Sequence, residues 1–158
     1  MACDPRLVRF KGDFNLYHLL AGIALVLLVT VAQVRAADLT VRDAWIRALP
    51  SAVPSGGYFT LHNGGVKPVV LTGAESPGCG MLMLHKSEDK GGMSAMTDVA
   101  EVPVAAGDTV KFVPGGYHLM CMDAKPAIKP GATVPVTLSF KDGGKLTVPF
   151  AVRNASGQ

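Results

Sequence analysis

Methionine and histidine are crowded into one stretch of this 158-residue chain. Apart from Met1, its methionines are Met81, Met83, Met93, Met96, Met120 and Met122. Two of its four histidines, His85 and His118, fall within the same stretch. Thioether sulfur and imidazole nitrogen are both metal-binding groups, so this crowding marks a candidate metal-binding region.

The spacing of these residues indicates which side chains could meet. His118-Leu119-Met120 follows a Gly-Gly pair and is typical of a strand, where residues i and i+2 share a face. Met122 would share that face. His85 ends an extended stretch over residues 81–86, and Met96 follows a loop that contains two glycines. These elements could bring together two imidazoles and two thioethers, from His85, Met96, His118 and Met120.

That ligand set favours one kind of metal ion. Thioether sulfur is soft and neutral and prefers Cu(I), and imidazole accepts copper readily. Zinc would recruit thiolates, carboxylates or more imidazoles. The residues therefore predict a Cu(I) site. An electron-transfer cupredoxin is an alternative, but its blue-copper centre needs a histidine after the cysteine, and none follows Cys121.

Methionine is also a common filler of hydrophobic cores. Composition alone therefore leaves open whether this stretch binds metal or packs inside a structural or adhesive sandwich. We interpret Met83, Met93 and Met122 as packing or auxiliary residues rather than primary ligands. We interpret His62, which stands beside the turn residue Asn63, as a residue without a metal partner.

Short strands and turns must position these residues. Apolar residues alternate over 134–140 and again over 146–152, and a Lys-Asp-Gly-Gly turn between them predicts a hairpin. Shorter segments rich in β-formers lie at 39–45, 58–61 and 69–71. No window of comparable length shows a helical apolar period outside residues 1–36. The pattern predicts an all-β fold, an antiparallel Greek-key sandwich or barrel.

The first 36 residues differ from the rest. Basic residues precede an apolar run from Leu19 to Ala32, which is shorter than the roughly 20 residues that a membrane span needs. A signal peptide that is cleaved after Ala36 fits this pattern, with an uncleaved anchor as the alternative. We therefore expect a leader over 1–36 and an exported metal-binding domain over 37–158.

Charge argues against nucleic-acid binding by the exported part. Four of the chain's 15 basic residues and two of its 12 acidic residues lie in the leader, which leaves residues 37–158 with a net charge of +1. No block of lysine and arginine with interleaved aromatic residues is present.

The exported part contains two cysteines, Cys79 and Cys121. In an oxidising compartment they could form one disulfide, but the sequence does not reveal whether they are close enough. Cys121 should face away from its strand neighbour Met120, so we do not count it as a ligand. A thiol-disulfide protein that uses the two cysteines is a further alternative, although no C-x-x-C motif is present.

The four candidate ligands follow the pattern H-x10-M-x21-H-x-M, which resembles the signature of the periplasmic copper chaperone family PCuAC. Segments 41–47, 57–63, 114–120 and 138–144 also resemble segments of that family, and the resemblance covers roughly residues 39–152. Lys86 is a departure, because relatives often carry an acidic residue there.

The resemblance implies a cupredoxin-like or immunoglobulin-like β-sandwich that binds one Cu(I) ion through His85, Met96, His118 and Met120. It also implies a periplasmic protein that carries copper to the dinuclear copper centre of a cytochrome c oxidase subunit. We expect a monomer. A thiol-containing assembly protein is an expected second partner. Because transfer by ligand exchange needs no covalent chemistry, no enzymatic activity is expected.

Overall fold

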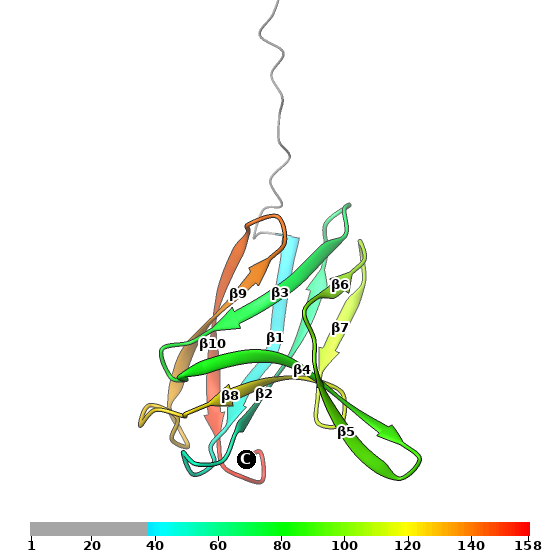
Figure 1. Cartoon of the computed structure of the whole chain (residues 1–158). Coiled ribbons are helices and arrows are strands. Elements are labelled where there is room, and N and C mark those ends of the chain that lie inside the picture. The colour runs from blue at the N-terminus through cyan, green and yellow to red at the C-terminus, as the bar shows by residue number, and fades with distance from the viewer. Residues whose placement is uncertain (1–37) are drawn as a thin grey trace, which may run out of the picture. The chain divides into compact units, whose positions relative to one another are not determined.

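The computed structural model describes residues 38–158, which form ten β-strands (Figure 1). The strands are β1 (Leu39–Arg47), β2 (Ser55–Asn63), β3 (Val69–Glu75), β4 (Met81–Lys90), β5 (Met93–Asp98), β6 (Val102–Val104), β7 (Thr109–Phe112), β8 (Tyr117–Met122), β9 (Thr133–Phe140) and β10 (Lys145–Arg153). The leader expected over 1–36 lies outside the described residues. Within the described range, no helix has the length and apolar character needed to cross a membrane.

The ten strands form one curled sheet in the order β5-β4-β8-β7-β2-β1-β10-β9-β3-β6. Figure 1 shows β3, β4 and β8 crossing over β1, β2 and β10, so the sheet folds into facing layers. This arrangement confirms the predicted all-β sandwich. The sheet is not purely antiparallel, because β1 runs parallel to β10 and β7 runs parallel to β8. The first strand lies beside the last one and so joins two halves of the fold.

Alternating side chains build the core as the sequence predicts. In β9, the apolar residues of the alternating pattern are all buried, namely Val134, Val136, Leu138 and Phe140. At the centre, the ring of Phe59 stacks on Phe112 with 4.2 Å between centroids and meets Phe150 edge-on at 5.6 Å. Aromatic pairs of this kind add about 0.5–1.5 kcal/mol each beyond the area that they bury.

The β4–β5 hairpin extends further than the sequence suggests. Lys90 pairs with Met93, so only Gly91 and Gly92 form the turn, and Met96 lies inside a strand. Both glycines have positive φ values, +66° and +85°, as a type I′ turn requires. That turn matches the natural twist of the two strands and keeps them paired up to its ends.

A disulfide joins Cys79, just before β4, to Cys121 in β8, and their Cα atoms are 5.5 Å apart. Both residues are buried in the core. The bridge settles the question that the sequence left open. It fixes the start of β4 against its neighbour β8, the two strands that carry most of the candidate ligands.

Candidate metal centre

Strands β4 and β8 place histidine opposite histidine and methionine opposite methionine. The facing pairs are His85 with His118, Met83 with Met120, and Met81 with Met122. The intervening residues Leu84, Leu119 and Cys121 are buried in the core, so the six paired side chains share the other face. The centroids of the two imidazole rings are 5.8 Å apart. The predicted common face of His118, Met120 and Met122 is therefore present, and the register adds His85 and Met83 to it.

Strand β5 brings the fourth candidate ligand to the same face. Met96 is opposite Ser87, and Asp98 is opposite His85, so Met96 is a diagonal neighbour of His85. Its exposure contrasts with that of the rings, because Met96 is 54% exposed whereas His85 and His118 are each 7% exposed. The site therefore combines buried nitrogen donors with an accessible sulfur donor.

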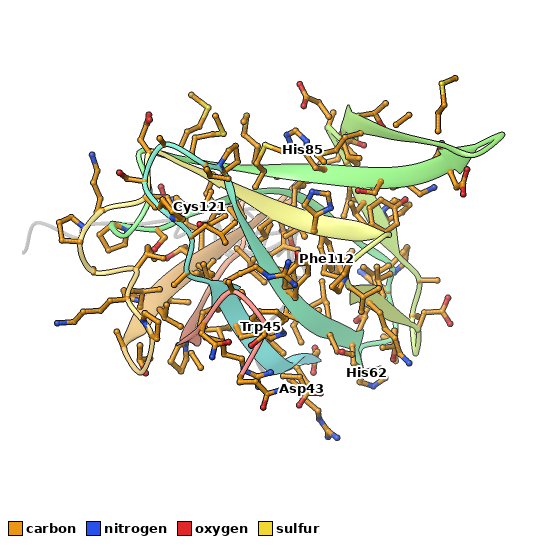
Figure 2. All side chains as sticks on the ribbon, turned by 90° about the horizontal axis from the view of Figure 1, so that it is seen from below. Asp43, Trp45, His62, His85, Phe112 and Cys121 are labelled. Atoms are coloured by element: carbon orange, nitrogen blue, oxygen red, sulfur yellow. A yellow bond between two sulfur atoms is a disulfide. The ribbon has the colours of Figure 1, made fainter. Side chains whose placement is uncertain are left out.

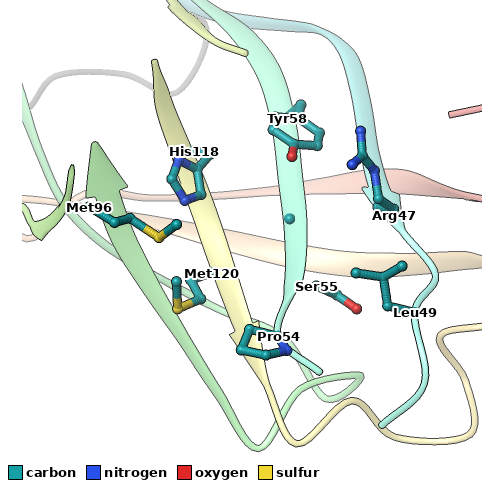
Figure 3. Close-up of a pocket in the computed structure, with 9 residues that line it drawn as sticks. Arg47, Leu49, Pro54, Ser55, Tyr58, Met96, His118 and Met120 are labelled. Atoms are coloured by element: carbon teal, nitrogen blue, oxygen red, sulfur yellow. The ribbon is translucent and has the colours of Figure 1, made fainter. Parts of the chain in front are cut away.

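A hollow of about 290 Å³ opens beside β8. Its lining residues are Arg47, Leu49, Pro54, Ser55, Gly56, Tyr58, Met96, His118 and Met120. Figure 3 shows the side chains of Met96 and Met120 next to each other and beside the His118 ring, with Arg47 and Leu49 across the hollow. Three of the four candidate ligands thus meet here. His85 does not line the hollow and joins the group as the cross-strand partner of His118 and the diagonal neighbour of Met96.

The ring of His118 is oriented by its own turn. Its Nδ1 lies 3.1 Å from the carbonyl oxygen of Gly116, and because that oxygen can only accept, Nδ1–H is the donor. In the neutral ring, Nε2 then keeps a free lone pair. Metal-binding histidines are commonly oriented in this way by a carbonyl on the other nitrogen.

The imidazole of His85 is buried and poorly satisfied. Its Nε2 lies 2.9 Å from Oδ1 of the exposed Asp98, an ion-pair distance, but neither ring nitrogen makes an aligned hydrogen bond. A buried polar atom without a hydrogen bond costs about 1–3 kcal/mol. Among the described residues, the other such side-chain atoms are Arg47 Nε and Ser55 Oγ, both from residues that line the hollow. Two of the unmet polar groups therefore lie in residues that line the hollow, and the other two belong to His85, the cross-strand partner of the lining residue His118.

Aromatic and cationic side chains border the site on β1 and β2. The Tyr58 ring lies 6.5 Å from His118 and 4.6 Å from Trp45, between centroids. The guanidinium carbon of Arg47 is 5.7 Å from the centre of each of those two aromatic rings. Sequence reasoning missed Arg47, Tyr58 and Asp98, since none has the ligand chemistry that drew attention to the histidines and methionines. Asp98 had one usable signal, its position two residues after Met96.

Lys86 does not place a positive charge on the ligand face. It alternates with His85 along β4 and so faces the other way. Its Nζ donates to Glu88 at 2.8 Å, and this hydrogen bond, followed by the charge of Glu88, raises the pKa of Lys86. Lys86, which replaces the acidic residue common in the family, therefore adds no positive charge to the face that carries the candidate ligands.

The remaining histidine and methionines have separate environments. His62 Nδ1 lies 3.0 Å from the Thr109 hydroxyl, and Figure 2 shows His62 on the opposite side of the molecule from His85. Met93 is 74% exposed at the β4–β5 turn, so it is not a packing residue. Met83 and Met122 are partly buried on the ligand face.

The alternative chemistries find little support. Cys121 is bonded to Cys79 and faces the core, so it offers no thiolate for a blue-copper centre and no free thiol for exchange. Within residues 38–158, no group of three histidine, cysteine, aspartate or glutamate side chains is placed to hold a metal ion. The candidate centre differs from such groups in drawing half of its donors from thioether sulfur.

Known proteins are similar to this chain in sequence and in fold. Residues 39–152 match the LpqE-like family. The chain is 31% identical over 118 residues to Lxx21020 of Leifsonia xyli subsp. xyli, which covers 74% of this chain and 70% of that protein. It is similar to the solution structure of CuI-DR1885 from Deinococcus radiodurans, with a TM-score of 0.58, 33% identity, and coverage of 70% of this chain and 74% of the other.

A more distant structure shares the fold. The copper-bound PCuAC domain from PmoF2 superposes with a TM-score of 0.61 at 20% identity, covering 74% of this chain and 93% of that domain. The family match spans nearly all of the described residues and coincides with the range over which the sequence resembles PCuAC. The chain therefore belongs to the PCuAC-related LpqE-like family.

Proposed function

We propose that this protein binds one Cu(I) ion through His85, Met96, His118 and Met120 and passes it to an acceptor protein by ligand exchange. The observation that carries the proposal is the paired, buried His85 and His118 beside the thioethers of Met96 and Met120. Similar structures hold copper, among them the copper-bound PCuAC domain from PmoF2 and CuI-DR1885, and this supports the choice of metal.

The donor set suits Cu(I) on chemical grounds. Two neutral imidazoles and two neutral thioethers leave the charge of the ion uncompensated, which favours a monovalent ion over a divalent one. The unsatisfied nitrogens of His85 and the free Nε2 of His118 are available without breaking a strong hydrogen bond. Binding the ion would remove the cost of burying the ring nitrogens of His85 without an aligned hydrogen bond.

The difference in exposure suggests the order of release. An incoming ligand reaches the accessible sulfur of Met96 before the two buried rings. Met96 would therefore leave the ion first, Met120 second, and the histidines last. Each step replaces one donor on the ion by a donor of the acceptor and transfers no electron, so copper stays Cu(I) and no enzymatic step is required.

The proposed location is the periplasm, reached through the leader expected over residues 1–36. An acceptor with a soft, partly empty site fits this mechanism, and we propose the dinuclear copper centre of a cytochrome c oxidase subunit, assisted by a thiol-containing assembly protein. A monomer suffices for the transfer, because all four ligands come from one chain.

Anaerobic titration of the metal-free protein with Cu(I), in competition with a chromophoric chelator, tests the proposal. We expect one tight equivalent, and copper K-edge absorption of that form should reveal nitrogen and sulfur scatterers together. A Met96→Ala/Met120→Ala variant should bind at least tenfold more weakly. Met93→Ala is the matched control, because Met93 shares the hairpin with Met96 but lies at its turn.

Two results would contradict the proposal. One is an affinity that is the same in the Met96→Ala/Met120→Ala variant as in the unchanged protein. The other is an intense blue colour with Cu(II), which would demand a thiolate that the disulfide does not provide.

A further inference from the structure

Three methionines on the ligand face have no part in the proposed centre. Met81 faces Met122 across the β4–β8 ladder, and Met83 faces Met120 on the adjacent rung. Opposite residues in such a ladder have Cβ atoms about 4.5–5.5 Å apart, and diagonal ones about 7–8 Å. Four thioethers therefore occupy a two-by-two block, one corner of which, Met120, belongs to the proposed copper centre. We call Met81, Met83 and Met122 the thioether block.

Packing does not explain this block. Met81 is 56% exposed, and Met83 and Met122 are only partly buried. The core beneath them is built instead from Leu82, Leu84, Leu119 and Cys121. Among the described residues, six large apolar side chains are exposed, and three of the six are methionines: Met81, Met93 and Met96. Met81 therefore fills no gap and offers its sulfur to the solvent, and Met83 and Met122 are partly accessible beside it.

The backbone under the block is held firmly. The disulfide joins Cys79 to Cys121, so it clamps β8 between Met120 and Met122 to the segment that leads into Met81. Gly80 adds two backbone hydrogen bonds, from its N–H to the carbonyl oxygens of Met122 and Asp123. A fixed backbone with flexible thioether arms suits a soft ion, because the arms adjust while their origins stay in place.

We propose that Met81, Met83 and Met122 form a second metal site, made only of thioethers, for a soft monovalent ion such as Cu(I). Three neutral sulfur donors select soft ions over zinc, calcium or magnesium. Without an imidazole, this site is weaker than the His–Met centre. Because Met120 borders both sites, an ion can move between them by exchanging one thioether at a time. This relay role rests on the function proposed above, whereas binding at the block does not.

Titration with Ag(I), a soft ion that undergoes no redox change here, tests the second site. The purified protein is labelled with 13C at the methionine methyl groups and followed by NMR. We expect the first equivalent to shift the methyl signals of Met96 and Met120, and the second to shift those of Met81, Met83 and Met122. The signal of Met93 should stay in place, because that exposed residue lies at the far end of β4 from the block.

Matched variants assign each equivalent of Ag(I) to one of the two sites. Met81→Leu/Met122→Leu should lose the second equivalent and keep the first, and Met93→Leu should keep both. Leucine conserves volume, so both variants should fold normally, which circular dichroism checks. His85→Ala/His118→Ala should lose the tight equivalent while the methyl shifts of the thioether block persist.

The outcomes separate the two proposals. Tight binding of one equivalent with no methyl shift at the block would overturn the second site and leave the proposed function intact. Shifts of Met93 as large as those of the block would mean indiscriminate binding to any exposed thioether and would also overturn it. If the block shifts but no tight equivalent forms in the unchanged protein, the second site stands and the His–Met centre fails.

Discussion

Removal of the Cys79–Cys121 disulfide should lower the free energy of unfolding by about 4 kcal/mol. The two cysteines are 42 residues apart in sequence. Cross-linking a loop of that length removes about 13 cal/mol/K of entropy from the unfolded chain, which is about 4 kcal/mol at 25 °C. For a domain of this size, each kcal/mol corresponds to about 4 °C, so the melting temperature should fall by about 15 °C.

Urea unfolding of two samples measures this effect. One is the Cys79→Ala/Cys121→Ala variant, and the other is the unchanged protein after unfolding in reductant and refolding with free thiols. The reduced sample keeps both buried sulfur atoms, so it isolates the cross-link from the loss of packing. The slope of unfolding free energy against urea should also rise, because the unfolded chain expands when its loop is opened.

A loss below about 1 kcal/mol in both samples would refute the reasoning, since it would mean that the unfolded chain already holds the loop ends together. Two free thiols in the native protein, counted by alkylation and mass spectrometry, would refute the bridge itself. If reduction lowers the free energy of unfolding but leaves the affinity for copper unchanged, then β4 and β8 keep their register without the disulfide.

Further predictions concern the metal centre and its walls. Met96→Leu should weaken Cu(I) binding at least tenfold in a chelator competition yet leave the melting temperature nearly unchanged, because the side chain is half exposed; equal affinity would contradict its role as a ligand. His118→Ala should reduce Cu(I) affinity and also cost about 1–3 kcal/mol in urea unfolding, because the ring is buried against Tyr58. Gly56→Ala should cost about 1–3 kcal/mol, because the added methyl overlaps the Tyr58 hydroxyl. Gly73→Ala is its control, since a methyl there meets nothing within 4 Å, and it should stay within about 0.5 kcal/mol.

Local pattern was enough to predict part of the site. The alternation of His118, Leu119 and Met120 put the first and third residues on one face, because a strand has a period of two. The same rule separated Cys121 from the ligand side, and the structure buries that residue in the core. These predictions involve neighbours in sequence, where backbone geometry alone decides the outcome.

Pairing over long distances could not be predicted in the same way. The register that sets His85 against His118 depends on how two strands far apart in sequence align, and a shift by one residue would turn His85 into the core. The disulfide depends on that alignment too. The site walls from β1 and β2 were missed because Arg47 and Tyr58 carry no ligand signature, and only folding places them beside His118.

The edge position of β5 would give an ion at the proposed centre a mechanical role. In the sheet order, β5 is terminal and pairs only with β4, whereas His118 and Met120 lie one strand beyond, on β8. An ion held by Met96 and by the β8 ligands would span three strands and tether the edge hairpin to the sheet interior. Binding of the ion would then slow amide hydrogen exchange along β5, and loss of the ion would restore the faster exchange. An acceptor that binds this hairpin could thereby distinguish the metal-bound protein from the metal-free protein by the flexibility of β5.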